Sequence, residues 1–158
     1  MTLKIQKVTT NVTPAHFELL LEADPSKELL DRYLQEGVLF EAVIEKIPVG
    51  VLLLTKTEEP NEIEIKNIAV SDQHQHQGIG SDLLQFAKDY ATEQGFSKLK
   101  VCTGSTSIGQ LYFYQKFGFR MSHIEPDFFV VNYDEPIYEN GIHLKDLVHL
   151  NLTLTSKK

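Results

Sequence analysis

The sequence predicts a mixed α/β (α+β) fold in which about four helices cover a central, mostly antiparallel mixed sheet of six to seven strands. Two patterns of apolar residues predict it. Apolar residues occupy every second position in 38–44 and 150–154, as in strands, whereas they recur every three or four positions in 78–94, as in an amphipathic helix. The 158 residues suffice for one hydrophobic core, so we expect a single domain over 1–158.

The N-terminal segment is expected to form one strand followed by two short helices. Residues 3–8 favour the strand. Thr13 is then a typical helix cap, and Pro14 a typical first helical residue. Asp24 and Pro25 repeat this start signal, so a second helix is expected after them.

Glycine and helix-capping residues mark the remaining boundaries. Gly37, Gly95 and Gly118 each follow a helix-periodic segment and are expected to end a helix. Thr106 and Ser107 can cap the helix that Gly118 ends. The remaining expected elements are strands at 38–44, 49–57, 62–70, 99–102, from 119 and at 150–154, and helices at 78–94 and 106–117.

The fourth strand contains a change of phase. Ile63 and Ile65 place apolar residues on odd positions, whereas Ile68 and Val70 place them on even positions. Because side chains alternate with period 2, one face stays buried only if an extra residue is inserted at 66–67, as a β-bulge. The alternative is a strand buried on both faces, in which the change of phase carries no meaning.

A polar turn, residues 71–80, joins this strand to the long helix. Gly78 and Gly80 let a ligand approach the backbone closely. The first N–H groups of a helix have no intrahelical acceptor, and they lie at the positive end of the helix dipole. An anion is therefore the expected occupant of the turn.

Residues 121–144 are the least regular part of the chain. They contain no Lys or Arg, but five acidic residues among several aromatic ones. Long irregular segments in compact domains are often binding loops. The alternative is a solvated acidic hairpin with a few core aromatic residues.

Composition excludes several classes of protein. A net charge of -7 argues against binding to duplex nucleic acid, which needs clustered Lys and Arg. No apolar run approaches the ~20 residues of a membrane span, and we expect no signal peptide. Cys102 is the only cysteine and cannot form an internal disulfide, so a cytoplasmic location is expected. It is interpreted as a small core residue, not a nucleophile.

Two motifs and the order of elements resemble the GNAT superfamily of N-acetyltransferases, which use acetyl-coenzyme A. Gln75, Gly78 and Gly80 fit the family's phosphate-binding pattern of Gln or Arg, two residues, Gly, one residue, then Gly or Ala. The segment from Tyr114 to Phe119 fits its Tyr-x-x-x-Gly-Phe motif. The resemblance covers roughly residues 3–125 and the last strand. It implies a GNAT-like fold in which the bulged fourth strand splays away from its neighbour.

The resemblance implies that acetyl-coenzyme A is a co-substrate and that no metal takes part. Oriented N–H groups of the turn would bind its pyrophosphate, and the N–H of Ile68 or Ala69 would polarise the thioester carbonyl. Ser107 stands where the family commonly has Asn, so an Asn-specific contact is not expected. The predicted cofactor-binding residues are Ile68, Ala69, Val70, Gln75, His76, Gln77, Gly78, Ile79, Gly80, Ser81, Ser107 and Tyr114.

The resemblance also implies an acid, because Tyr114 matches the family position whose hydroxyl protonates the leaving thiolate. The alternative is a core tyrosine on an amphipathic helix. The attacking amine must lose a proton, since an alkyl ammonium has a pKa of about 10.4. Glu64, just before the bulge, is the predicted base. Glu41, His123, Asp127 and water are the alternatives.

The acceptor is expected to be a cationic small molecule with a primary amine, because acidic and aromatic residues gather in 121–144. Its predicted ligands are Asp127, Tyr133, Asp134 and Glu135. The alternatives are a protein N-terminal or lysine acetyltransferase and a non-catalytic acyl-CoA sensor or scaffold. Family members often pair into dimers, and nothing in the sequence fixes an interface.

One pattern suggests a metal, since His74 and His76 are spaced as two ligands are. Two histidines without a nearby Cys make an incomplete site, so no metal is predicted and both are interpreted as exposed polar residues.

Overall fold

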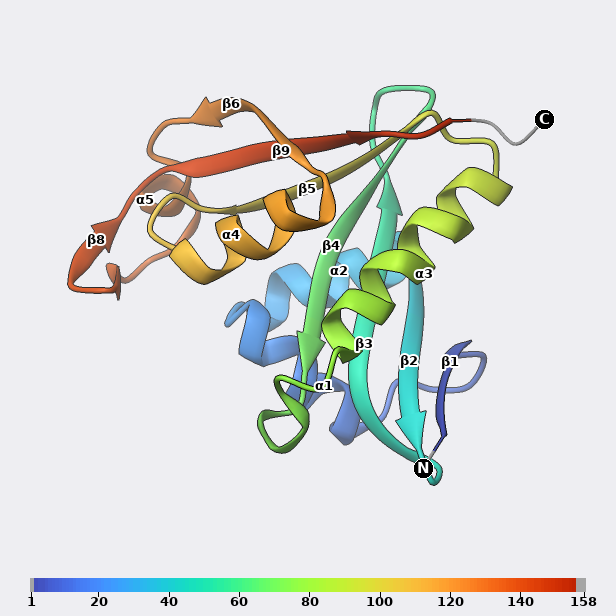
Figure 1. Ribbon diagram of the computed structural model, residues 1–158. Coiled ribbons are helices and arrows are strands. Elements are labelled where there is room, and N and C mark those ends of the chain that lie inside the picture. Colours follow the sequence, from blue (N-terminus) through green and yellow to red (C-terminus); the bar gives the residue numbers. More distant parts are fainter. Residues whose placement is uncertain (1, 156–158) are drawn as a thin grey trace.

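The computed structural model describes residues 2–155. Figure 1 shows its elements in order: β1 (Leu3–Lys7), α1 (Pro14–Ala23), α2 (Lys27–Glu36), β2 (Val38–Ile44), β3 (Ile47–Lys56), β4 (Glu62–Val70), a 3₁₀ turn (Asp72–His74), α3 (Ile79–Glu93), β5 (Lys98–Gly104), α4 (Ile108–Phe117), β6 (Arg120–Glu125), α5 (Phe128–Asn132), β7 (Ile137–Glu139), β8 (Ile142–Leu144) and β9 (Leu147–Thr153). No helix within these residues is both long and apolar enough to cross a membrane.

Seven strands form one sheet in the order β1-β2-β3-β4-β5-β9-β6, and β7 and β8 form a separate hairpin. All neighbouring strands in the sheet are antiparallel except β4 and β5. The predicted mixed fold is therefore confirmed. The segment 121–144 is more regular than predicted, because it contains most of β6, all of α5 and the β7–β8 hairpin. A hairpin lies at its end, but Glu139 is the one acidic residue within 137–144, so it is not the solvated acidic hairpin of the alternative interpretation.

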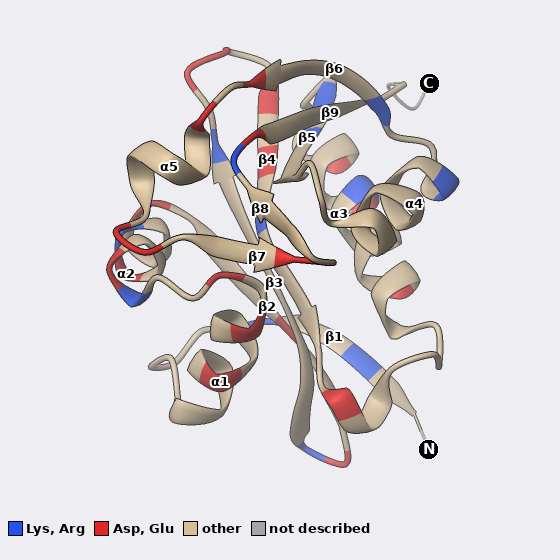
Figure 2. Cartoon of the chain, turned by 90° about the vertical axis from the view of Figure 1, so that its left-hand side faces the viewer, with Lys and Arg blue, Asp and Glu red and all other residues tan. Residues whose placement is uncertain are grey.

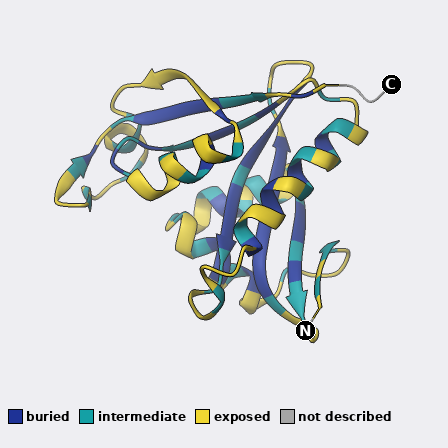
Figure 3. Ribbon diagram, viewed as in Figure 1, coloured by how far each residue is buried: buried dark blue, intermediate teal, exposed yellow. Residues whose placement is uncertain are grey.

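Two hydrophobic cores lie on opposite faces of the sheet. Leu83 and Leu84 of α3 and Tyr114 of α4 belong to the core on one face. Leu20 of α1 and Leu30 of α2 belong to the core on the other. The central strands are therefore covered on both sides, and Figure 3 shows β3 and β4 buried along most of their lengths. Burial on both faces explains the nearly continuous apolar run of β3.

The predicted bulge in β4 is confirmed. Leu53 of β3 lies opposite Asn67, and the next residue, Leu54, lies opposite Ile65, so Lys66 is the extra residue. β4 is also buried on both faces, as the alternative interpretation held. The change of phase nevertheless marks a real irregularity.

Beyond the bulge, β4 separates from β5. The two strands pair only along residues 62–65 and 98–101, and Figure 1 shows them diverging after that point. The N–H of Ser71 donates to the carbonyl of Val49. Because bonding sides alternate along an antiparallel strand, the backbone groups of Ala69 also face β3, whereas those of Ile68 and Val70 face the gap between β4 and β5.

The helix starts test the predicted caps. Thr13 caps α1 as predicted, through a bond from the backbone N–H of His16. The cap of α2 is Ser26 and not Asp24, because the Ser26 hydroxyl accepts the N–H of Leu29. Asp24 instead ends α1, and its carboxylate accepts the N–H of Ser26 at 3.0 Å. Ser107 occupies the cap position of α4, but its side chain makes no capping bond.

Candidate active site

A cavity of about 600 Å³ lies where the end of β4, the start of α3 and the start of α4 meet. Most of the predicted cofactor-binding residues line it, namely Ile68, Ala69, Val70, Gln75, His76, Gly78, Ile79, Gly80, Ser81 and Ser107. Gln77 does not line it, and Tyr114 lines a neighbouring cavity. The sequence did not indicate the contribution of α1 and the β7–β8 hairpin, which add residues such as Glu22 and Asn140, or of Gly109 and Phe113 on α4.

The start of α3 presents backbone N–H groups to this cavity, which we call the cofactor groove. Gly78 is the N-cap, with a φ of +83° in the left-handed region, and it has no side chain to bond the first N–H groups of the helix. The helix begins where the N–H of Asp82 donates to the Gly78 carbonyl at 3.0 Å. The preceding N–H groups, those of residues 79–81, have no intrahelical acceptor and are available to an anion.

Two further features of the groove fit a phosphate-bearing ligand. A Cβ on Gly80 would come within 3.2 Å of the Phe113 ring, so the glycine lets α4 approach the start of α3. Within residues 2–155, the enclosed Nδ1 of His74 has no hydrogen-bond partner. A buried nitrogen without a partner costs free energy unless a ligand or water binds it. His74 is therefore a wall of the groove, not the exposed polar residue predicted.

A second cavity, of about 530 Å³, lies beside the first. Ile68 and Ser107 line both, so the two cavities meet at the gap between β4 and β5. Its walls come from β4, β5, β9, α5 and the β7–β8 hairpin. We call this second space the acceptor cavity.

Tyr114 lines the acceptor cavity from α4. Its side chain is 4% exposed, and its ring packs edge-on against Phe119. Burial, with a smaller contribution from Cys102, raises the pKa of its hydroxyl well above the usual range. The hydroxyl therefore keeps its proton at neutral pH. The core interpretation holds for this residue, its side chain lines the acceptor cavity and not the cofactor groove, and its role as the acid stays a prediction.

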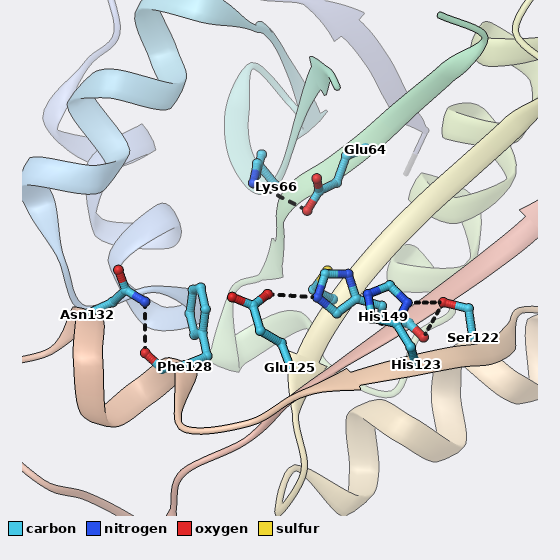
Figure 4. Close-up of polar contacts among 9 residues, drawn as sticks. Glu64, Lys66, Ser122, His123, Glu125, Phe128, Asn132 and His149 are labelled. Carbon is cyan, nitrogen blue, oxygen red and sulfur yellow. Dashed lines mark hydrogen bonds and ion pairs between the residues drawn. The ribbon is translucent and has the colours of Figure 1, made fainter. Parts of the chain in front are cut away.

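Glu64 also lines the acceptor cavity, and Figure 4 shows it beside Lys66. Glu64 is 7% exposed, and its carboxylate lies 3.3 Å from the Lys66 ammonium. The ammonium also lies 4.7 Å from the centre of the Tyr33 ring. Burial alone would lower the pKa of Lys66, but the neighbouring Glu64, with smaller contributions from Tyr33 and Cys102, outweighs it and raises the pKa. Lys66 is therefore a fixed positive charge in the cavity.

The other candidate bases lie elsewhere. Glu41 lines neither cavity, and its carboxylate is bonded to His16 and Gln6 at 2.8 Å each. Burial raises the pKa of Glu41, but these bonds outweigh it, and the pKa is lowered. Asp127 is exposed and lines neither cavity. His123 stacks on another histidine and does not line the cavity either.

That second histidine, His149 of β9, is a cavity residue that the sequence analysis missed. Its Nε2 lies 3.0 Å from the carboxylate of Glu125, and its Nδ1 lies 3.4 Å from the sulfur of Cys102 (Figure 4). The available signal was a histidine between apolar neighbours, on the opposite strand face from Leu150 and Leu152. Because β9 pairs with β5 and β6, three strands bring these side chains together.

Cys102 differs from its prediction in part. It lines the acceptor cavity and is not a closed core residue. Burial, and then the nearby charge of Glu64, raise the pKa of its thiol to about 12. A thiol with that pKa is protonated at neutral pH, which agrees with its interpretation as a non-nucleophile.

The predicted acceptor ligands are only partly brought together. Tyr133 lines the cavity, and its hydroxyl donates to the carboxylate of Asp24 at 3.1 Å. Burial, followed by Asp24, raises the pKa of this hydroxyl. Asp134 and Glu135 are exposed and do not line the cavity, as is also true of Asp127. Figure 2 shows acidic segments on α1, on α2 and between α5 and β7, around the β7–β8 hairpin.

The β7–β8 hairpin is tied to the turn before α4. The hydroxyl of Ser107 donates to the Glu139 carboxylate at 2.6 Å, and that of Thr106 donates to it at 3.1 Å. The amide of Asn140 donates to the carbonyl of Thr106 at 2.8 Å. The Ser107 hydroxyl therefore contacts the hairpin, and it accepts no N–H of α4. These bonds fix the hairpin as a wall of both cavities.

The described residues, 2–155, contain no group of three or more His, Cys, Asp or Glu side chains placed to hold a metal ion.

Comparison with known proteins relates residues 7–119 to the acetyltransferase (GNAT) family. A Bacillus subtilis protein described as the uncharacterized N-acetyltransferase YvbK is 44% identical over 138 residues, which cover 87% of this chain and 88% of that protein. A GNAT family acetyltransferase from Elizabethkingia anophelis, solved with acetyl-CoA bound, is 44% identical, with a TM-score of 0.91. The match covers 96% of this chain and 98% of that chain. A Bacillus subtilis acetyltransferase solved with CoA is 41% identical, with a TM-score of 0.92. The match covers 98% of this chain and 100% of that chain.

Proposed function

This chain belongs to the GNAT family of acetyl-CoA-dependent acetyltransferases, and we propose that it acetylates the primary amine of a cationic small molecule by direct attack within a ternary complex. One observation carries the proposal. Two cavities meet at the gap between β4 and β5, and one suits an anionic cofactor whereas the other is lined by more acidic than basic side chains.

The cofactor groove would hold acetyl-coenzyme A through backbone groups. The free N–H groups of 79–81 would bind the pyrophosphate with the help of the helix dipole. Ile68 and Val70 turn their backbone groups toward the gap, so they would bind the pantetheine amides. Of the two predicted thioester contacts, the N–H of Ile68 faces the gap and that of Ala69 faces β3, which favours Ile68 as the donor to the carbonyl oxygen. The bound cofactor supplies an activated acetyl thioester.

Two side chains would then move protons. Tyr114 keeps its proton at neutral pH and lines the cavity, so it would protonate the departing thiolate. A thiol has a pKa of about 8.5, so this step needs modest help. Glu64 would hold the acceptor ammonium and accept the proton that it loses before attack.

The charges of the acceptor cavity support a cationic acceptor. Its acidic lining residues are Glu22, Asp24, Glu64, Glu125 and Glu139. Its basic ones are Lys66 and Lys100. Phe128, Phe129 and Tyr133 add aromatic surface, on which an alkyl ammonium binds favourably.

Glu64→Gln tests the acceptor site. We expect kcat/KM for the amine to fall roughly 10²-fold, because both the charge that holds the ammonium and the proton acceptor are lost. Thiol release with spermidine as the amine measures it. The matched control is the double variant Asp134→Asn and Glu135→Gln, which removes two exposed charges near the cavity. The double variant should lower kcat/KM a few-fold at most, and this decrease should disappear at high salt. A roughly 10²-fold fall of kcat/KM in the control, with no fall in Glu64→Gln, would contradict the assignment of Glu64 to the acceptor site.

The acceptor class is tested by thiol release from acetyl-coenzyme A over a panel of amines. The panel holds spermidine, kanamycin, free lysine and a short peptide with an unblocked N-terminus. Fastest release with spermidine or kanamycin is the expected result. Fastest release with the peptide would instead favour a protein N-terminal acetyltransferase.

A further inference from the structure

A row of polar side chains crosses the sheet face that lines the acceptor cavity. Glu64 on β4 and Cys102 on β5 both line the cavity. His149 on β9 lies directly opposite Cys102 in the strand register, and His123 on β6 lies opposite His149. The two imidazole rings stack with centroids 4.0 Å apart. The proposed reaction so far uses only Glu64 from this row, although His149 is 7% exposed and is held on both sides.

The hydrogen bonds of His149 fix which of its nitrogens carries the proton. The carboxylate of Glu125 can only accept, so the Nε2 that lies 3.0 Å from it is the donor. Nδ1 is left with a lone pair. Its neighbour is the Cys102 sulfur at 3.4 Å, whose S–H is a weak donor that an amine can displace.

Four titratable groups face His149, and burial together with two of these groups favours its neutral form. Burial lowers the pKa of His149, and the charges of Lys100 and His123 lower it further. Glu125 acts in the opposite direction without reversing the shift. The fourth group, the thiol of Cys102, stays protonated at neutral pH. His149 is therefore a neutral imidazole with a free lone pair at neutral pH.

We propose that His149 is a catalytic residue whose Nδ1 accepts the proton that the acceptor nitrogen loses as it bonds to the acetyl carbon. Glu125 is a positioning residue, because it holds the ring in the tautomer that leaves Nδ1 free. The inference rests on the proposed amine acetylation. It gives the two bases separate tasks, since Glu64 receives the ammonium and His149 receives the later proton.

The protons and bonds of this step balance. The C–N bond forms while the C–S bond breaks, and the sulfur keeps the bonding electrons and takes a proton from Tyr114. The nitrogen passes its proton to Nδ1 of His149. Return of that proton through solvent to the Tyr114 phenolate restores both side chains. Glu64 releases the earlier proton of the ammonium to solvent, so the products are the amide, the free thiol and one proton.

His149→Gln tests the catalytic role, with spermidine as the amine. With both substrates at saturating concentration, we expect kcat at pH 7.5 to fall roughly 10²- to 10⁴-fold, which is the usual contribution of a positioned proton acceptor. The wild-type kcat should fall as the pH drops through the pKa of His149, which lies below the ordinary histidine value. This acid limb of the pH profile of kcat should be absent in His149→Gln. His143→Gln, outside the acceptor cavity on β8, is the matched histidine control and should keep both rate and limb.

Glu125→Gln tests positioning without threatening the core, because the Glu125 side chain is 49% exposed. Loss of its charge should move the acid limb to lower pH and reduce kcat, with the KM for acetyl-coenzyme A unchanged. A purely structural role would leave the acid limb in place.

Loss of the acid limb in His123→Gln but not in His149→Gln would overturn the proposal. So would a loss in Cys102→Ala as large as that in His149→Gln, because it would assign the chemistry to the thiol.

A ¹⁵N spectrum of the imidazoles of the full chain needs no acceptor. We expect an unprotonated Nδ1 and a protonated Nε2 at His149, with a pKa below the ordinary histidine value that falls further in Glu125→Gln. A protonated Nδ1 would overturn the proposal. If spermidine gives no thiol release, the acceptor class fails while this spectrum still decides the proton position. If spermidine is acetylated and His149→Gln keeps full kcat, only the role of His149 fails.

Discussion

Gly78→Asp is expected to weaken the binding of acetyl-coenzyme A roughly 10²-fold. Gly78 is the N-cap of α3 with open space around its Cα, so a new side chain there enters the cofactor groove. Two negative charges about 5 Å apart repel by about 3 kcal/mol at an effective dielectric constant of about 20, which equals roughly two powers of ten in affinity. Isothermal titration with acetyl-coenzyme A measures the change.

Two controls separate charge from backbone strain. Asn and Asp both tolerate the left-handed region and have nearly the same shape, so Gly78→Asn should cost tenfold at most. Gly95 ends α3 with a φ of +87° and equally open surroundings, far from the groove. Gly95→Asp should lower the melting temperature about as much as Gly78→Asp does, with unchanged affinity. Equal losses of affinity for Gly78→Asn and Gly78→Asp would refute an anion site at this helix start.

Tyr114→Phe is expected to reduce kcat roughly 10²-fold and to leave measurable turnover. The raised pKa keeps the hydroxyl protonated at neutral pH, so its proton is present for the leaving thiolate, and loss of a positioned acid typically costs at least this much. The reaction survives because a thiolate is a tolerable leaving group. Stopped-flow thiol release at saturating acetyl-coenzyme A and spermidine measures the chemical step.

Tyr112→Phe is the matched control for this substitution. Tyr112 lies on the same helix and is 64% exposed, so its hydroxyl is remote from the chemistry. Its kcat should not change. Tyr114→Phe with full turnover and an unchanged affinity for acetyl-coenzyme A would exclude an essential acid role and leave Tyr114 as a core residue.

The cofactor groove was largely predictable from the sequence, because it depends on local backbone geometry. Gly78 and Gly80 determine the turn and the close packing of two helices, and the change of phase at 66–67 determines the bulge. These features are local, so spacing along the chain reveals them. The splay of β4 from β5 was predicted from the family resemblance together with the bulge.

The acceptor half was less predictable, because tertiary contacts assemble it. His149, Glu125 and Cys102 lie on three different strands, and only the pairing of β9 with β5 and β6 brings them together. The acidic residues of 121–144 looked alike in the sequence. In the fold, Glu139 anchors a hairpin and Glu125 contacts His149, whereas Asp134 and Glu135 are exposed.

The most direct test of amine acetylation in a ternary complex is a two-substrate initial-rate experiment with acetyl-coenzyme A and spermidine, followed by mass spectrometry of the amine. We expect double-reciprocal lines that intersect and an amine heavier by one acetyl group for each thiol released. Parallel lines would indicate an acetylated enzyme and would contradict direct attack. Binding of acetyl-coenzyme A without thiol release from any amine of the panel would contradict the enzymatic account and favour a sensor.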